Sequence, residues 1–140
     1  MAGYTFLDNR LSVSDFVMLW RDAGWVDIPK DLVETALRNS YATFLVTDGV
    51  RSVGMARLLG DGAMSFFLKD FVIAQDLRGK GLGSTLLAHV EDYIRAQLKP
   101  GWKGYIQLVS AKDKEAFYEK NGYLSHPNAD SGSAMSKWIG

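Results

Sequence analysis

Residues 75–94, "QDLRGKGLGSTLLAHVEDYI", pass from a cluster of glycines directly into a helical pattern. Gly79, Gly81 and Gly83 stand within five residues. A glycine loses more backbone entropy on folding than any other residue, so this cluster indicates a backbone that something must approach closely. Apolar side chains then recur at helical spacing to about residue 98, which predicts a helix that begins inside the glycine cluster.

A glycine-rich turn that opens a helix predicts an anion site. The first helical N–H groups have no intrahelical acceptor, and the helix dipole places partial positive charge at the same end. Arg78 and Lys80 lie inside the cluster and can add side-chain contacts to a phosphate. A plain tight turn with a glycine cap is the alternative that the pattern leaves open.

Two common nucleotide loops are excluded by the residues at fixed positions. A P-loop needs Gly-Lys followed by Ser or Thr, whereas here Gly83 precedes Ser84. A G-x-G-x-x-G fingerprint counted from Gly79 or from Gly81 would end at Ser84 or at Leu86, and neither is glycine.

The chain before the loop predicts three antiparallel strands. Asp48-Gly49 and Asp61-Gly62 separate apolar runs, and Asp-Gly in such a place is a strong hairpin signal because glycine readily takes positive φ. The third strand runs directly into the glycine loop. The three strands cover about 42–47, 51–59 and 64–73.

The remaining segments complete a predicted order of β-α-α-β-β-β-α-β-α-β-β. This order predicts an α/β fold with a mixed, mostly antiparallel sheet and helices on both faces. At 140 residues, the chain is expected to form a single domain, 1–140. The further elements are a strand at 4–7, helices at 12–24, 29–40 and 111–123, a strand at 104–110, and "AMSKWI" at 134–139 as the last strand.

Composition excludes several classes of function. The 16 basic and 16 acidic residues balance, so bulk charge gives no argument for nucleic acid or for a membrane as a partner. With no cysteine, thiolate metal sites and a cysteine nucleophile are excluded, and two histidines far apart make no metal site. The absence of a long apolar stretch or a basic N-terminal flank predicts a cytoplasmic protein.

The pattern R-x-x-G-x-G, filled by Arg78, Gly81 and Gly83, resembles the acyl-CoA pyrophosphate loop of the GNAT superfamily of N-acyltransferases. The resemblance extends to "DFVIAQDLRGKGLGSTLL", which is similar to the family's strand, loop and helix, and to "AFYEKNGY", which resembles its later "FYEKxGF" segment. The order of elements also matches the GNAT fold over nearly the whole chain, so a single GNAT domain is expected.

This resemblance implies acetyl-CoA as the co-substrate, without a metal. The backbone at Val72 and Ile73 would pair with the pantetheine arm, where the strand parts from its neighbour. One position departs from the family, because Ala111 stands where an asparagine often contacts the cofactor, so that contact is missing or comes from Ser110. The pyrophosphate would lie on the N–H groups of Arg78, Gly79, Lys80, Gly81, Leu82, Gly83 and Ser84.

The chemistry implied is direct attack of a neutral amine on the thioester. A backbone N–H near Val72 would polarise the carbonyl, and Tyr118 of "FYEKNGY" would protonate the leaving thiolate as general acid. Asp70, which interrupts the apolar run "FFLKDFVI", is the candidate general base. The alternatives are a packed core tyrosine at Tyr118, and a solvated carboxylate at Asp70 with water as the proton acceptor.

The acceptor is the least specified partner. In the GNAT family the segment joining the first two helices lines the acceptor pocket. The resemblance therefore implies an aromatic wall from Trp20 and Trp25, with Asp22 or Asp27 to attract a cation. Core tryptophans and solvated aspartates are the alternative. We expect a small-molecule primary amine and a monomer or homodimer; a protein or peptide amine, a non-catalytic acyl-CoA sensor, and a protein-interaction module stay open.

Overall fold

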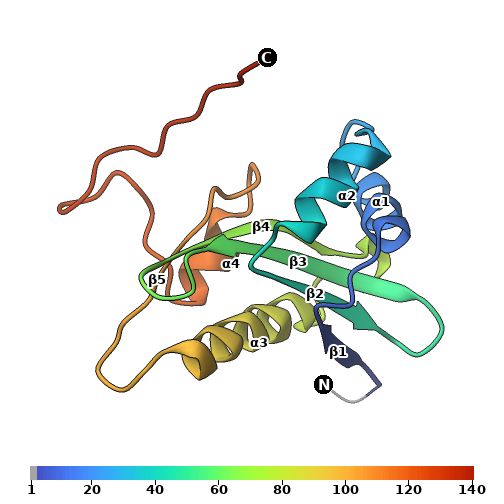
Figure 1. The fold of residues 1–140 in the computed structure, drawn as a ribbon, viewed down its shortest axis with the longest axis horizontal. Helices are drawn as coiled ribbons and strands as arrows, with labels where there is room; N and C mark the ends of the chain where they lie inside the picture. Colours follow the sequence, from blue (N-terminus) through green and yellow to red (C-terminus); the bar gives the residue numbers. More distant parts are fainter. Residues whose placement is uncertain (1–2) are drawn as a thin grey trace. The chain divides into compact units, whose positions relative to one another are not determined.

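The computed structural model describes residues 3–140, and it divides the chain into two compact units (Figure 1). One unit ends at Gln107 and the other begins at Leu108. The first unit contains β1 (Thr5–Asp8), α1 (Val13–Asp22), α2 (Lys30–Arg38), β2 (Ala42–Thr47), β3 (Ser52–Gly60), β4 (Ser65–Ile73), the short 3₁₀ helix η1 (Gln75–Leu77), α3 (Leu82–Gln97) and β5 (Tyr105–Gln107).

The first unit is a sheet of five strands in the order β1-β2-β3-β4-β5. Neighbouring strands are antiparallel except for β4 and β5, which are parallel, so the predicted mixed sheet is confirmed. α1 and α2 lie on one face of this sheet and α3 lies on the other (Figure 1). Both predicted Asp-Gly turns join the antiparallel strands, with φ of 95° at Gly49 and 76° at Gly62.

The two turn aspartates show why these hairpins form here. Asp61 Oδ1 accepts backbone N–H groups from Ser65, Ala63 and Met64, and these bonds lower the pKa of its carboxyl group. Asp48 Oδ1 accepts in the same way from the backbone N–H groups of Val50 and Arg51. In these tight turns the aspartate side chain takes the place of a backbone carbonyl and accepts the hydrogen bonds of the N–H groups.

Apolar side chains fill both faces of the sheet. On the face of α1 and α2 the core cluster consists of Leu11, Phe16, Leu19, Val33, Leu45, Met55 and Val72. α1 begins where Ser12 caps it, since the Ser12 hydroxyl accepts the Asp15 N–H at 3.0 Å. α3 buries Leu82, Leu86, Leu87, Val90 and Ile94, which line one face of the helix.

The second unit, residues 108–140, contains α4 (Glu115–Lys120) and a long tail. α4 ends at Asn121, whose side-chain amide donates to the Phe117 carbonyl at 2.8 Å. The two final strands of the predicted order are absent from the described residues, so this part of the prediction is wrong. Met135, Trp138 and Ile139 are more than nine-tenths exposed, because the apolar pattern "AMSKWI" finds no strand to pair with.

Candidate active site

The feature that defines the candidate site is a parting between two neighbouring strands. β5 pairs with β4 only over Ser65–Phe67, whereas β4 continues to Ile73. Within residues 3–140, the second half of β4 is paired with β3 on one side only. Val72 and Ile73, the residues expected to pair with the pantetheine arm, lie in this half.

The glycine loop follows at the end of β4. η1 comes first, and then the chain turns through Gly79 and Gly81, whose φ angles of 77° and 86° lie in the left-handed region that favours glycine. Gly81 is the N-cap of α3, and no side chain caps that helix. Residues 78–84, predicted to cradle a pyrophosphate, therefore form a loop and a first helical turn that present backbone to a ligand.

The two basic side chains of the loop have different surroundings. Arg78 is exposed, but its Nε donates to the Ile73 carbonyl at 3.1 Å, which ties the loop to the end of β4. Lys80 is exposed and has no ion-pair partner in the described part of the chain. Lys80 is consequently the cation that can reach a phosphate without losing an existing contact.

β4 contains a bulge at Asp70, the predicted general base. The register with β3 shifts between Met55 and Arg57, so that Ala56 alone stands opposite two residues, Asp70 and Phe71. Asp70 has a φ of 53°, and its Oδ2 accepts the Arg57 Nε at 2.8 Å. The two side chains of this ion pair are only 14% and 10% exposed.

Arg57 is a site residue that the sequence prediction did not include. The available signal was a single arginine inside the apolar run "VGMARLL", which a buried partner explains. Asp70 itself is neither a solvated strand residue nor an isolated buried acid, because Arg57 holds one of its two oxygens. Its Oδ1 accepts no hydrogen bond from the described residues.

Tyr118, the predicted general acid, lies in α4 of the second unit. Its ring packs edge-on against Phe117 at 5.0 Å and Tyr123 at 5.9 Å between centroids. Burial raises the pKa of Tyr118 to about 12. Its phenol is therefore protonated at neutral pH and can donate a hydrogen bond, while its complete ionisation is unfavourable.

Ser110, which the sequence suggested as a substitute for the missing asparagine, makes a local contact. Its hydroxyl donates to the carbonyl of Ala111 at 2.7 Å. The hydroxyl can contact a cofactor only by sharing or breaking this bond.

The four residues predicted to line an acceptor pocket all make contacts within the first unit. Trp20 packs edge-on against Trp25 at 4.7 Å and donates its Nε1 proton to the Val26 carbonyl at 2.7 Å. Asp27 pairs with Arg21 at 2.9 Å. The remaining residue of the four, Asp22, accepts the backbone N–H of Gln75 at 2.9 Å through Oδ2, which fastens the end of α1 to the start of η1.

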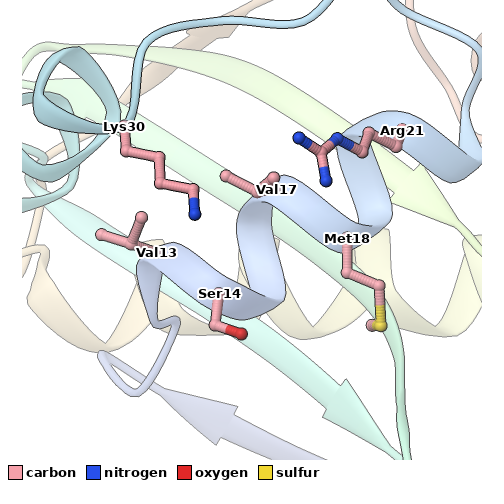
Figure 2. Close-up of a pocket in the computed structure, with 6 residues that line it drawn as sticks. All are labelled: Val13, Ser14, Val17, Met18, Arg21 and Lys30. Carbon is pink, nitrogen blue, oxygen red and sulfur yellow. The ribbon is translucent and has the colours of Figure 1, made fainter.

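A cavity of about 590 Å³ lies in the same region of sequence but is lined by other residues (Figure 2). Figure 2 shows Arg21 of α1 and Lys30 of α2 on either side of Val17. Both cations lie on the two helices that flank the predicted acceptor segment, and neither was predicted as a site residue. The complete lining is Val13, Ser14, Val17, Met18, Arg21 and Lys30.

Among residues 3–140, no group of three or more His, Cys, Asp or Glu side chains could hold a metal ion. No helix in this range is both long enough and apolar enough to cross a membrane.

Known proteins share this architecture. The family model described as "Acetyltransferase (GNAT) domain" matches residues 39–124. An uncharacterized N-acetyltransferase, ycf52, of Pyropia yezoensis is 26% identical over 133 residues, covering 92% of this chain and 74% of that protein. GCN5-related N-acetyltransferase 2, chloroplastic, of Arabidopsis thaliana is 26% identical and covers 89% and 54%. A probable acetyltransferase of Staphylococcus aureus has a similar structure, with a TM-score of 0.81, 24% identity and coverage of 96% and 99%.

Proposed function

This chain belongs to the GNAT acetyltransferase family, and on that premise we propose that it transfers an acetyl group from acetyl-CoA to a primary amine of a small molecule. The observation that carries the proposal is the parting of β5 from β4, directly before the glycine loop. An extended amide-bearing arm can add to the open half of β4 as a strand would, and its phosphates then reach the start of α3.

The cofactor contacts in this proposal are mostly backbone contacts. The open edge at Val72 and Ile73 binds the pantetheine arm, and the N–H groups of residues 78–84 bind the pyrophosphate. Lys80 adds a charged contact, supported by its exposure and by the fact that it forms no ion pair among residues 3–140. The Ile73 carbonyl is already used by Arg78, so the arm pairs with the other backbone groups of this edge.

The chemical step needs a carbonyl polarised, a thiolate stabilised and a proton removed from the amine. We assign the polarisation of the carbonyl to the backbone N–H near Val72, which directly follows the bulge in β4. Tyr118 serves the thiolate. Because the pKa of Tyr118 is raised to about 12, and a thiol has a pKa of about 8.5, the phenol donates a hydrogen bond and transfers its proton only partly in the transition state.

Asp70 is proposed as the proton acceptor for the amine. Oδ2 is held by Arg57, so the oxygen that remains for the amine, or for a water that relays its proton, is Oδ1. A carboxylate fixed in this way also attracts the ammonium form of the acceptor before it loses its proton.

A small-molecule acceptor stays a prediction of the sequence, because the cavity beside α1 contains none of Asp70, Val72 and Ile73 in its lining. A protein or peptide amine stays the alternative. The cytoplasmic location and the state of monomer or homodimer stay predictions of the sequence, and one relative is described as chloroplastic.

The direct test is thiol release from acetyl-CoA with a panel of small amines, amino acids, amino sugars and peptides. We expect turnover with at least one small amine, together with a rise in melting temperature on adding CoA. A rise in melting temperature with no thiol release from any amine would identify an acyl-CoA sensor. No shift with CoA or acetyl-CoA would favour the interaction module and reject the proposal.

A further inference from the structure

The bulge in β4 and the buried ion pair occur at the same residue. Asp70 is the residue with a left-handed backbone inside the strand, and its side chain is the one that Arg57 binds. Aspartate tolerates this conformation better than most residues, but it still prefers an extended one in a strand. Something in the surroundings must therefore hold Asp70 in place, and the Arg57 contact is the side-chain interaction there.

Arg57 is well placed for this task. It lies on β3, whose pairing with β2 is regular over 42–46, and it stands opposite Lys69, the residue directly before the bulge. The guanidinium is thus anchored on the ordered interior of the sheet, while its partner belongs to the segment that departs from regular pairing. With both side chains at least 86% buried, water competes little for the contact.

We propose that Arg57 is a positioning residue which, by binding the Asp70 carboxylate, fixes the bulge of β4 and so sets the course of the backbone at Phe71–Ile73. The catalytic consequence rests on the proposed function, in which this backbone holds the thioester. Arg57 itself touches no reacting atom. It keeps the backbone donor near Val72 aligned with the carbonyl, and a displacement of this kind by about 1 Å can cost roughly 100-fold in rate.

Two substitutions separate this role from proton transfer by Asp70. Asp70→Asn keeps an oxygen that can accept from Arg57 and tolerates the left-handed backbone, but it cannot take a proton. Arg57→Met keeps the carboxylate and the approximate length of the side chain, but it removes the clamp. The first variant tests the base and the second tests the clamp.

For Arg57→Met we expect faster hydrogen–deuterium exchange at the amides of residues 70–73, with unchanged exchange in β2. We also expect kcat to fall about 10- to 100-fold, with a smaller rise in the Kd of acetyl-CoA, because the displaced backbone at Val72 and Ile73 is proposed to bind the pantetheine arm whereas residues 78–84 are untouched. Arg57→Lys should recover part of the loss. The matched control is Arg95→Met, which breaks the exposed Asp92–Arg95 pair. It should change neither the exchange at residues 70–73 nor kcat nor the Kd of acetyl-CoA.

Parent-like exchange at 70–73 in Arg57→Met would overturn the proposal, whatever the activity. If that variant does not fold, Arg57→Met combined with Asp70→Gly removes the unpaired buried carboxylate and places glycine at the positive φ. Faster exchange at 71–73 in this double variant supports the clamp, and parent-like exchange there rejects it. Because exchange needs no substrate, an absence of acetyl transfer in the parent would reject the proposed function without deciding the clamp.

Discussion

The end of β4 with its glycine loop, and the helix α4, contribute to the proposed reaction in different ways. In the first region the binding groups are backbone atoms, placed by strand pairing, a bulge and two left-handed glycines. In α4, by contrast, the contribution is the hydroxyl of one side chain, Tyr118, on a helix of six residues.

This difference predicts where substitutions are tolerated. Backbone groups survive most side-chain changes, so the cofactor region should fail only where a new side chain occupies the ligand's space or distorts the chain. A side-chain donor fails as soon as its one atom is removed.

Tyr118→Phe removes the donor and keeps the ring with its two aromatic contacts. We expect turnover to fall by about 10²–10⁴, or about 2.7–5.5 kcal/mol of barrier, with acetyl-CoA affinity nearly unchanged. Steady-state kinetics and calorimetry measure the two quantities. Parent turnover, with chemistry shown to be rate-limiting, would remove Tyr118 from the mechanism, and a large loss of stability would mark it as a core aromatic.

The same variant has a pH signature. The folded-state pKa of Tyr118, about 12, lies above the ordinary value of 10, so folding favours the protonated phenol. The stability it contributes is complete below pH 10 and is lost as the pH rises from 10 to 12. Alkaline unfolding curves should show a smaller loss in this window for Tyr118→Phe than for the parent.

Gly81→Val tests the backbone side of the comparison. Valine is strained at a φ of 86° and adds a branched side chain where the pyrophosphate is proposed to lie. At a ligand concentration 100 times its Kd, acetyl-CoA should stabilise the parent by about 2.7 kcal/mol, and the variant should lose this increment. Normal acetyl-CoA binding by a folded Gly81→Val protein would show that the phosphate site is wrongly placed.

Asp70→Asn should have a smaller effect, because water can take the amine proton in its place. We expect turnover to fall about tenfold, or about 1.4 kcal/mol, and the acidic limb of the rate–pH profile to flatten. Acetyl-CoA affinity should stay within about twofold. A profile and rate equal to those of the parent would exclude Asp70 as the proton acceptor.

The smallest effect is expected in the tail of the second unit. Trp138 is 98% exposed, so Trp138→Ala should change the free energy of unfolding by less than about 0.5 kcal/mol. Phe66→Ala is the matched substitution in the sheet, where the side chain is 1% exposed, and should cost about 3–5 kcal/mol. Chemical denaturation measures both, and a large loss at Trp138 would show that the tail packs on something in solution.

The course of the chain from β4 into α3 was predictable because its signals are local. Asp-Gly turns, glycines with positive φ and helical spacing each act within a few residues, and the loop of residues 78–84 forms where they indicated. Arg57 and Asp70 were harder to pair, because they are 13 residues apart and meet only through the bulge. The prediction of the final strand was wrong for a related reason. The pattern of "AMSKWI" is compatible with a strand, but it does not specify a strand with which the segment would pair.

The outer strands of the sheet, β1 and β5, have four and three residues, whereas β3 and β4 have nine each. A strand at the border of a sheet offers unpaired backbone groups to any other chain that can extend alongside it, which is how aggregation begins. Both borders of this sheet end in short strands, but β5 pairs with β4 only over residues 65–67. Among the described residues, 68–73 of β4 therefore remain an open edge, so the stretch proposed to bind the cofactor is also one at which another extended chain can add.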